Sequence, residues 1–449
     1  MKLFYDIKDK PKFPQLVVYA IQQLLAIMAA TLVVPIIIGN GMQPSAALFG
    51  AGVGTLIYVA FTKANSPVFL GSSFAFLGSM GAAFAGAVSA QAGYAGIIIG
   101  AAFAGLVYVV ISLIVKFVGV AWIDKLMPKQ VIGPTVAIIG LSLAGNAVGD
   151  LQTGKYMVEG VATANPLIAV ACGLVTLVVT MLCSTYGKKS IKLIPFIIGI
   201  LSGYAFAVVM TLIGTKTGND ALKLIDFSVF SGISLFALPD FTFLTAMKGI
   251  KEIDGAYIGT IAAAYLPVAF VVFAEHIADH KNISSIIGKD LLKEPGLHRT
   301  LLGDGVGSMV GAFFGGCPNT TYGESVACVA LTKNASVYTI ITAAIGAIII
   351  AFLQPFVAFV DSIPSCVMGG VCMALYGFIA VSGLKMVQTV NLEDNKNLYT
   401  VSVILIAGIG GLTLNFGKIT ITSIACALIL GILTNIILSK AKAPVEDAE

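Results

Sequence analysis

The sequence is poor in charged residues. Only 11% of its 449 residues are Asp, Glu, Lys or Arg, whereas 58% are hydrophobic and the mean hydropathy is +0.98. An ordinary soluble domain carries roughly a quarter charged residues. This composition excludes a soluble globular protein, a disordered chain and a collagen-like chain.

Neither the cysteines nor the basic residues indicate a binding site. The seven cysteines include no C-x-x-C pair and mostly lie in apolar runs, which favours small buried side chains over a disulfide or metal framework. The net charge of +4 is spread between apolar blocks and forms no basic face, so we expect no nucleic acid partner. We also expect no cofactor.

Long apolar runs and 49 glycines are what the sequence does have. No charged residue lies between Lys12 and Lys63 or between Lys63 and Lys116, and each gap can hold two membrane spans of roughly 20 residues. Small residues let such helices pack closely. The whole chain predicts about 14 spans, near residues 14–39, 45–62, 68–86, 92–118, 130–149, 164–186, 191–214, 256–279, 299–316, 319–332, 335–360, 364–384, 397–415 and 419–439.

The distribution of Lys and Arg indicates the orientation, because cytoplasmic loops carry the excess. With the N-terminus inside, 20 of the 26 basic residues fall on the inner side. The other six are Lys155, Lys216, Lys223, Lys248, Lys251 and Lys418. We therefore expect a multi-pass protein of the cytoplasmic membrane, embedded in the lipid bilayer, with both termini cytoplasmic.

The longest polar connection, residues 215–255, divides the spans into two halves of seven. An odd number per half gives the halves opposite topology, as in the inverted repeats of many transporters. The short third and tenth spans carry a weak echo, S-S-F-A-F at 72–76 and T-T-Y-G-E at 320–324, each flanked by Gly or Pro. Paired interrupted segments of this kind point to a binding site at the middle of the membrane.

Ionisable residues inside spans are expensive, so they are functional candidates by default. Glu275 and Asp279 lie one helical turn apart on the eighth span, Asp304 lies early in the ninth and Glu324 lies in the tenth. His280 and His298 fall at the predicted cytoplasmic margin, where loop or capping roles are the simpler interpretation. The alternative for Asp279, beside His280, is that it caps the cytoplasmic end of its helix. The cluster E-H-x-x-D-H lacks metalloprotease spacing, and nothing favours an intramembrane hydrolase, so we expect no enzyme.

Glycines at 303, 307, 311 and 315 repeat every four residues along the ninth span. They predict a smooth face for close helix packing and no ligand.

Three segments carry a resemblance to a known family: V-V-F-A-E-H-I-A-D-H (271–280), K-D-L-L-K-E-P-G-L-H-R-T (289–300) and G-G-C-P-N-T-T-Y-G-E (315–324). With L-G-S-S-F-A-F (70–76) and Gln22-Gln23, they resemble the nucleobase/ascorbate transporter family over nearly the whole chain, and specifically its bacterial uracil permeases. The resemblance implies proton symport of a nucleobase by an all-α polytopic protein with a 7+7 inverted repeat and short antiparallel β-strands in the third and tenth segments. It is also compatible with a homodimer.

The resemblance divides the chain into a core domain (1–118 and 256–360) and a gate domain (119–255 and 361–449). It implies that Glu275 and Glu324 bind the base, with main-chain groups of the short strands at Phe74, Tyr322 and Gly323. A small residue of the first span, Ala30, completes the implied set. Phe74 or Tyr322 offers a ring for stacking.

Three departures from the family pattern affect the mechanism. The first span has Gln22-Gln23 where Gln-His is common, and Ser325-Val326-Ala327 follows Glu324 in place of Asn-x-Gly. Asp279 stands where the best-known uracil permeases have His. Purine-transporting relatives have Asp at this position, as this chain does. We expect Asp279, coupled to Glu275, to carry the coupling proton, with Asp304 as a further candidate.

The leading hypothesis is therefore a uracil:proton symporter. The alternatives are a purine (xanthine or urate) symporter of the same family, which Asp279 and Asp304 favour, and an anion transporter of related 7+7 fold. An anion site would prefer positive charge, and the only basic residues near the paired segments are Lys63 and Lys333 at their cytoplasmic ends.

Overall fold

The structure is a computed structural model that describes residues 3–119, 122, 128–159, 161–188, 191–416 and 419–439. The predicted cytoplasmic C-terminal tail beyond residue 439 lies outside the described residues. So do six of the lysines that indicate the orientation: Lys2, Lys125, Lys189, Lys418, Lys440 and Lys442.

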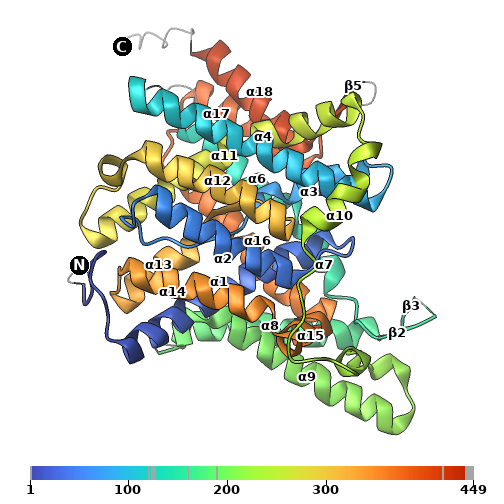
Figure 1. The fold of residues 1–449 in the computed structure, drawn as a ribbon. Coiled ribbons are helices and arrows are strands. Elements are labelled where there is room, and N and C mark those ends of the chain that lie inside the picture. Colours follow the sequence, from blue (N-terminus) through green and yellow to red (C-terminus); the bar gives the residue numbers. More distant parts are fainter. Residues whose placement is uncertain are drawn as a thin grey trace, which may run out of the picture.

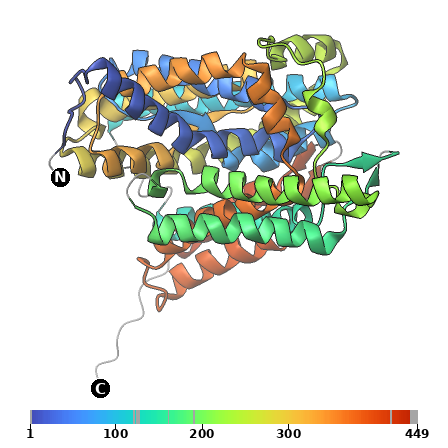
Figure 2. The same cartoon turned by 90° about the horizontal axis from the view of Figure 1, so that it is seen from below.

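The described helices pack in two groups (Figures 1 and 2). In the first group, α12 packs against α2 and α4, while α14 packs against α1 and α2 and α11 packs against α4. Its helices are α1 (Phe13–Ile38), α2 (Pro44–Phe61), α3 (Leu77–Ala85), α4 (Ala90–Val118), α10 (Thr242–Gly249), α11 (Gly255–Ile287), α12 (Leu297–Gly315), α13 (Gly323–Thr332) and α14 (Val337–Ala351).

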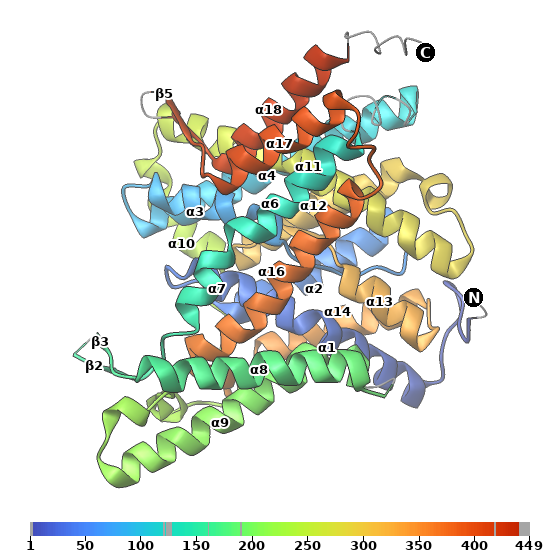
Figure 3. The same ribbon diagram turned by 180° about the vertical axis from the view of Figure 1, so that it is seen from behind.

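In the second group, α16 packs against α6 and α8, while α8 packs against α9 and α17 packs against α6 and α18. Figure 3 shows α16 beside α6, with α8 running across the lower end of α16 and α9 below α8. Its helices are α6 (Lys129–Ser142), α7 (Ala144–Asp150), α8 (Pro166–Tyr186), α9 (Pro195–Thr217), α16 (Ser365–Val387), α17 (Asn395–Ile409) and α18 (Ser423–Leu438). The short α15 (Gln354–Ser362) joins α14 to α16.

Eight of the described helical segments are long and apolar enough to cross a membrane: α1, α2, α4, α6 with α7, α8, α9, α11 and α16. The six other ranges that the sequence predicts as spans contain α3, α12, α13, α14, α17 and α18. The chain is thus a multi-pass, mainly helical membrane protein.

Two segments of the first group are broken by strands. β1 (Leu70–Ser72) and β4 (Asn319–Thr321) pair antiparallel, with Gly71 opposite Thr320. After β1 the chain passes through a single 3-10 turn (Phe74–Phe76) into α3, and after β4 it enters α13 at once. The strand pair therefore brings the starts of two short helices together.

The sequence did not anticipate three features. Two further two-stranded sheets form, β2 (Met157–Val158) with β3 (Val161–Ala162) and β5 (Leu414–Phe416) with β6 (Ile419–Ile421). The polar connection after α9 contains α10, which packs against α4 and α12, although its residues fall in the range expected for the gate domain.

Local chemistry explains where the long helices begin. Proline occupies one of the first two positions of α1, α2, α8 and α9, where its missing N–H costs no helical hydrogen bond. The Asp254 side chain accepts a hydrogen bond from the Tyr257 main-chain N–H (2.7 Å) and caps α11. That helix continues to Ile287, two turns beyond the predicted end of its span.

The residues before α1 are held against the first group. The main-chain N–H of Ala335 donates to Tyr5 O (2.9 Å), that of Val337 donates to Ile7 O (3.0 Å), and the Ile7 side chain is buried. The Lys289 ammonium lies 2.6 Å from an Asp6 carboxylate oxygen and lowers the pKa of that carboxyl. This segment therefore ties the α13–α14 connection to the α11–α12 connection.

The glycine face of α12 packs as the sequence predicts. A Cβ atom added to Gly307 would lie 3.0 Å from Gly54 O of α2, and one added to Gly315 would lie 2.5 Å from Ala46 O. Gly303 similarly faces Tyr58 and Phe61 of α2, and Gly311 faces the Asn319 side chain. These contacts involve main chain that cannot move aside without separating the helices.

We predict that Gly315→Ala lowers the free energy of unfolding by about 1 to 3 kcal/mol, because an added methyl group overpacks the α2–α12 contact. Gly377→Ala in α16 is the matched control, since no atom lies within 4 Å of its added Cβ. Thermal unfolding of the purified protein should show a lower midpoint only for Gly315→Ala. Equal midpoints for the two variants would contradict this packing.

Candidate functional site

A cavity of about 440 Å³ lies where the β1–β4 pair of the first group faces α6 and α16 of the second. Phe74, Tyr322 and Gly323 line it beside the strands, and Glu275, Asp279 and Glu324 contribute three carboxylates to its wall. At its other end it reaches Lys192, Leu331 and Met386. The cavity therefore runs from the strand pair toward one end of α13 and α16.

The main chain at the strand pair is well satisfied. The N–H of Tyr322 donates to Phe69 O (3.2 Å) and that of Ser73 donates to Pro318 O (2.9 Å), which extends the ladder at both ends. Side chains complete it, since Leu70 N–H donates to Thr55 Oγ1 (3.0 Å). Buried main chain outside a helix requires such internal partners.

The first turn of α13 lies at the cavity wall. Gly323 is the first residue of α13, and the first N–H groups of a helix have no main-chain acceptor within that helix. Such a helix start also carries a partial positive charge. The site thus combines fixed hydrogen-bond donors with acceptor carboxylates.

The three residues that the resemblance implies for main-chain contacts lie just after the strands. Phe74 begins the 3-10 turn, Tyr322 is the N-cap of α13 and Gly323 is its first residue, so all three follow the strands and do not belong to them. Gly323 is exposed to the cavity, where an added Cβ would contact only Asp279 Oδ1 at 3.8 Å.

The two aromatic rings differ in their availability for stacking. The Tyr322 hydroxyl donates to Ser72 O (2.7 Å), and its ring packs so closely on Gly71 that it leaves no space for a side chain there. Phe74 is only partly buried and meets Tyr376 of α16 edge-on, with ring centroids 6.2 Å apart. Of these two rings Phe74 is therefore the more available to a ligand, and Phe196 and Phe378 of the second group also line the cavity.

Ala30 does not lie where the resemblance implies. It is 3% exposed in the packed interior and does not line the cavity, whereas Ala26, one helical turn earlier on α1, does. The small residue of α1 that lines the cavity in this structure is Ala26, and a role of Ala30 in binding the substrate stays a prediction.

Glu275 and Asp279 lie in the middle of α11, far from either end of the helix. The Glu275 side chain is exposed to the cavity. Asp279 accepts a hydrogen bond from the Thr321 hydroxyl of β4 (2.8 Å). A capping role for Asp279 at a helix end is excluded, because α11 continues for two more turns.

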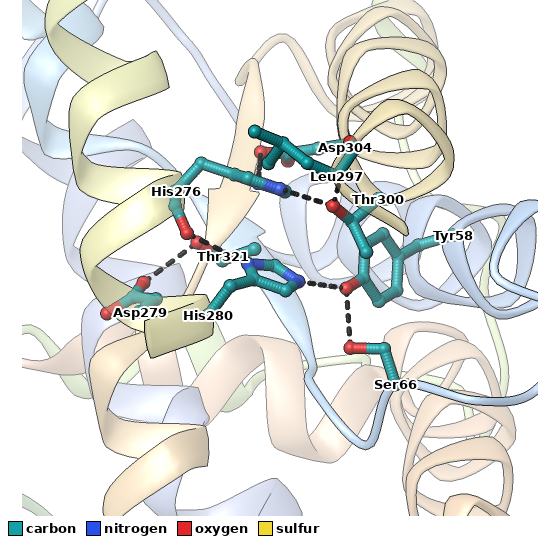
Figure 4. A network of polar contacts seen from close by, with 9 residues as sticks. All are labelled: Tyr58, Ser66, His276, Asp279, His280, Leu297, Thr300, Asp304 and Thr321. Atoms are coloured by element: carbon teal, nitrogen blue, oxygen red, sulfur yellow. Dashed lines mark hydrogen bonds and ion pairs between the residues drawn. The ribbon is translucent and has the colours of Figure 1, made fainter. Parts of the chain in front are cut away.

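The histidines of this region lie deeper in the protein than the sequence predicts. His280 is fully buried, so the expected loop or capping role is wrong for it. Its neighbour His276 is also fully buried and contacts Asp304, which thus lies away from the cavity (Figure 4). His298 lies in the first turn of α12. Among the described residues no group of three or more His, Cys, Asp or Glu is placed to hold a metal ion.

Two departures from the family pattern meet in space. The Gln23 side-chain amide donates to Ser325 Oγ, which also accepts the Phe69 main-chain N–H (3.0 Å). Gln23 and Ser325 are both buried. Their contact fixes α13, directly after Glu324, against α1 and the residue that precedes β1. The sequence indicated each departure but could not indicate that they touch.

Comparison with known proteins identifies the family. The sequence pattern of the family described as "Permease family" matches residues 14–417. The chain belongs to this family. It is 38% identical to the uracil permease of Bacillus caldolyticus, over 96% of this chain and 94% of that protein, and 36% identical to the uracil permease of Bacillus subtilis, over 98% and 96%.

Solved structures show a related fold. The transmembrane domain of the cyanobacterial bicarbonate transporter BicA superposes with a TM-score of 0.62 and covers 96% of this chain and all of that domain. With 14% sequence identity, this similarity concerns the arrangement of the helices alone.

We predict that Ser325→Ala lowers the free energy of unfolding by about 1 to 3 kcal/mol, because the Phe69 N–H and the Gln23 amide lose a shared buried acceptor. Ser308→Ala in α12 is the matched control, since the buried Ser308 hydroxyl has no hydrogen-bond partner among the described residues. Thermal unfolding should separate the two variants. If Ser325→Ala were as stable as Ser308→Ala, the Gln23–Ser325–Phe69 contact would not hold this site together.

Proposed function

We propose that this permease imports uracil across the cytoplasmic membrane by proton symport. The observation that carries the proposal is the cavity beside the β1–β4 pair, whose wall holds two carboxylates, Glu275 of α11 and Glu324 in the first turn of α13. The named uracil permeases that align with nearly the whole chain support uracil as the substrate.

The chemistry of uracil fits such a site. Its flat ring presents two N–H donors and two carbonyl acceptors in one plane, so carboxylates match the donors and free main-chain N–H groups match the carbonyls. In this proposal Glu275 and Glu324 accept the ring N–H groups, the first turn of α13 at Gly323 donates to a carbonyl, and Phe74 stacks on the ring face. Tyr322 contributes only by positioning that turn.

The architecture of the proposed transporter follows the two packing groups. The first group corresponds to a core domain (1–118 and 256–360) that holds the substrate, and the second to a gate domain (119–255 and 361–449), except that α10 belongs with the core. Fourteen membrane segments in two inverted halves are supported by a helix in every predicted span and by the pairing of the two broken segments. Assembly as a homodimer remains a prediction from the family resemblance.

The direction of the cavity supports an inward-facing state. It reaches Lys192 before α9 and Met386 at the end of α16, both on the side where the basic residues place the cytoplasm. Movement of the core against the gate would close this route and open the opposite one. The proposed proton carriers are the carboxylates Glu275 and Asp279 on the cavity wall and Asp304 behind α11.

A purine is the second candidate substrate. Asp279 adds a third carboxylate to the cavity, and a purine such as xanthine offers more N–H donors than uracil does. Uptake of radiolabelled uracil into proteoliposomes, with unlabelled xanthine, urate or sulfate as competitors, separates the candidates. Inhibition by unlabelled uracil alone supports the proposal. Inhibition by xanthine supports a purine site, and inhibition by sulfate supports an anion transporter.

We predict that Glu275→Gln and Glu324→Gln each weaken uracil binding roughly ten- to hundredfold, since each loses a hydrogen bond to a charged acceptor, about 1.5 to 3 kcal/mol. Calorimetry on the purified variants measures this loss. Glu393→Gln, in the exposed connection between α16 and α17, is the matched control and should bind like the unchanged protein. Unchanged affinity in either cavity variant would remove that residue from the substrate site.

A further inference from the structure

A second polar cluster lies on the opposite side of α11 from the cavity (Figure 4). Glu275 and Asp279 line the cavity, whereas His276 and His280 are both fully buried and stack on each other with ring centroids 4.0 Å apart. One helix thus carries two chemically distinct faces, and neither histidine lines the substrate cavity.

The hydrogen bonds of His276 account for both of its ring nitrogens. Nδ1 lies 2.7 Å from Asp304 Oδ2, and Nε2 lies 2.9 Å from Thr300 Oγ1. Thr300 Oγ1 also lies 3.1 Å from Leu297 O, a second possible acceptor for its proton. A hydroxyl has one proton, so Thr300 donates either to Leu297 O or to His276 Nε2, but not to both at once.

Counting protons gives two arrangements that use the same three side chains. When Thr300 donates to Leu297 O, Nε2 must carry a proton to donate to Thr300, and the close Nδ1–Oδ2 contact then requires a second proton between His276 and Asp304. The pair is neutral overall. When Thr300 donates to Nε2, Nδ1–H donates to an Asp304 carboxylate and the pair carries one negative charge. The two arrangements differ by one proton and by rotation of one hydroxyl group.

The surroundings favour the protonated arrangement in this state. Asp304 is fully buried and its Oδ1 has no hydrogen-bond partner among the described residues, which an ionised carboxylate would need. The titratable groups around the pair are Tyr58 of α2, Tyr108 of α4 and Glu275, Asp279 and His280 of α11. None of these neighbours carries a permanent positive charge, so the proton itself neutralises the site.

Further contacts hold the histidines in place. His280 Nδ1 donates to His276 O (2.8 Å), and its Nε2 lies 2.6 Å from the Tyr58 hydroxyl, which also bonds Ser66 (2.7 Å). Tyr58 of α2 therefore holds His280, and the His280 ring stacks on that of His276. They position the pair and do not themselves face the cavity.

We infer that His276, Asp304 and Thr300 form a proton-binding site behind the substrate cavity, with the Thr300 hydroxyl switching its donor direction as the proton enters or leaves. This inference rests on the proposed symport and assigns its coupling proton to Asp304 and His276 in place of Asp279. Because α11 carries Glu275 on one face and His276 on the other, a shift of this helix changes both sites together. Proton binding takes the site from one negative charge to neutral.

The decisive variant is Asp304→Asn, which keeps the size of the side chain but cannot exchange this proton. We expect it to bind uracil within about threefold of the unchanged protein and to exchange uracil across proteoliposomes without a gradient. We expect it to lose accumulation driven by an imposed pH gradient, and to lose the proton movement that accompanies uracil entry in weakly buffered vesicles. Ser308→Ala, which removes an unpartnered hydroxyl one turn along α12 from Asp304 and outside the cavity, is the comparison and should keep both.

Uptake by the unchanged protein and by Asp304→Asn under a pH gradient distinguishes failure of this inference from failure of the proposed symport. If the unchanged protein does not accumulate uracil under a pH gradient, the proposed symport itself fails. If both the unchanged protein and Asp304→Asn accumulate uracil, the inference is overturned and the symport stands. Loss of coupling in Asp279→Asn with its retention in Asp304→Asn would move the proton to the cavity wall.

Variants of Thr300 test the same inference if Asp304→Asn does not fold. Thr300→Val keeps the shape but removes the switching hydroxyl, so the pH at which accumulation is half-maximal should shift by at least about one unit. Thr300→Ser should restore the original midpoint, and Ser308→Ala, which removes an unpartnered hydroxyl on the same helix, should leave it unchanged. Identical pH profiles for Thr300→Val and Thr300→Ser would overturn the inference.

Discussion

The structure depends on one constraint: buried main chain outside a helix must find its hydrogen-bond partners within the protein. β1 and β4 are both buried, and they satisfy their main-chain groups by pairing with each other. Thr55 and Ser325 supply the acceptors that the ladder lacks. Without this pairing neither α3 nor α13 could begin where it does, and the carboxylate of Glu324 would have no fixed position.

The same constraint explains the close packing of the first helical group. The strands lie against α12 and α2, and there the glycines of α12 remove the side chains that would keep the strands away. The Asn319 amide fills the remaining space and donates to Gly50 O of α2 (3.0 Å). The glycine repeat is therefore the packing condition for the site, although no glycine of the repeat touches the cavity.

Much of this could be predicted from the sequence, because apolar length and charge spacing depend on local composition. The helical ranges, the two interrupted segments within 68–86 and 319–332 and the candidates Glu275, Asp279 and Glu324 all follow from such patterns. What could not be predicted depends on contacts between distant residues. His280 is buried against Tyr58 of α2. Whether Ala26 or Ala30 lines the cavity depends on the rotation of α1 about its axis. The Gln23–Ser325 contact joins positions 302 residues apart.

The central claim is that the substrate is held at the strand pair, between Glu275 and Glu324 and the first turn of α13. An experimental structure of the protein with uracil bound tests it most directly. We predict that the ring lies in the cavity beside Phe74, with its two N–H groups within hydrogen-bond distance of the two carboxylates and a carbonyl oxygen facing the main chain at Gly323. A ring bound elsewhere, or one that contacts neither carboxylate, would contradict the account.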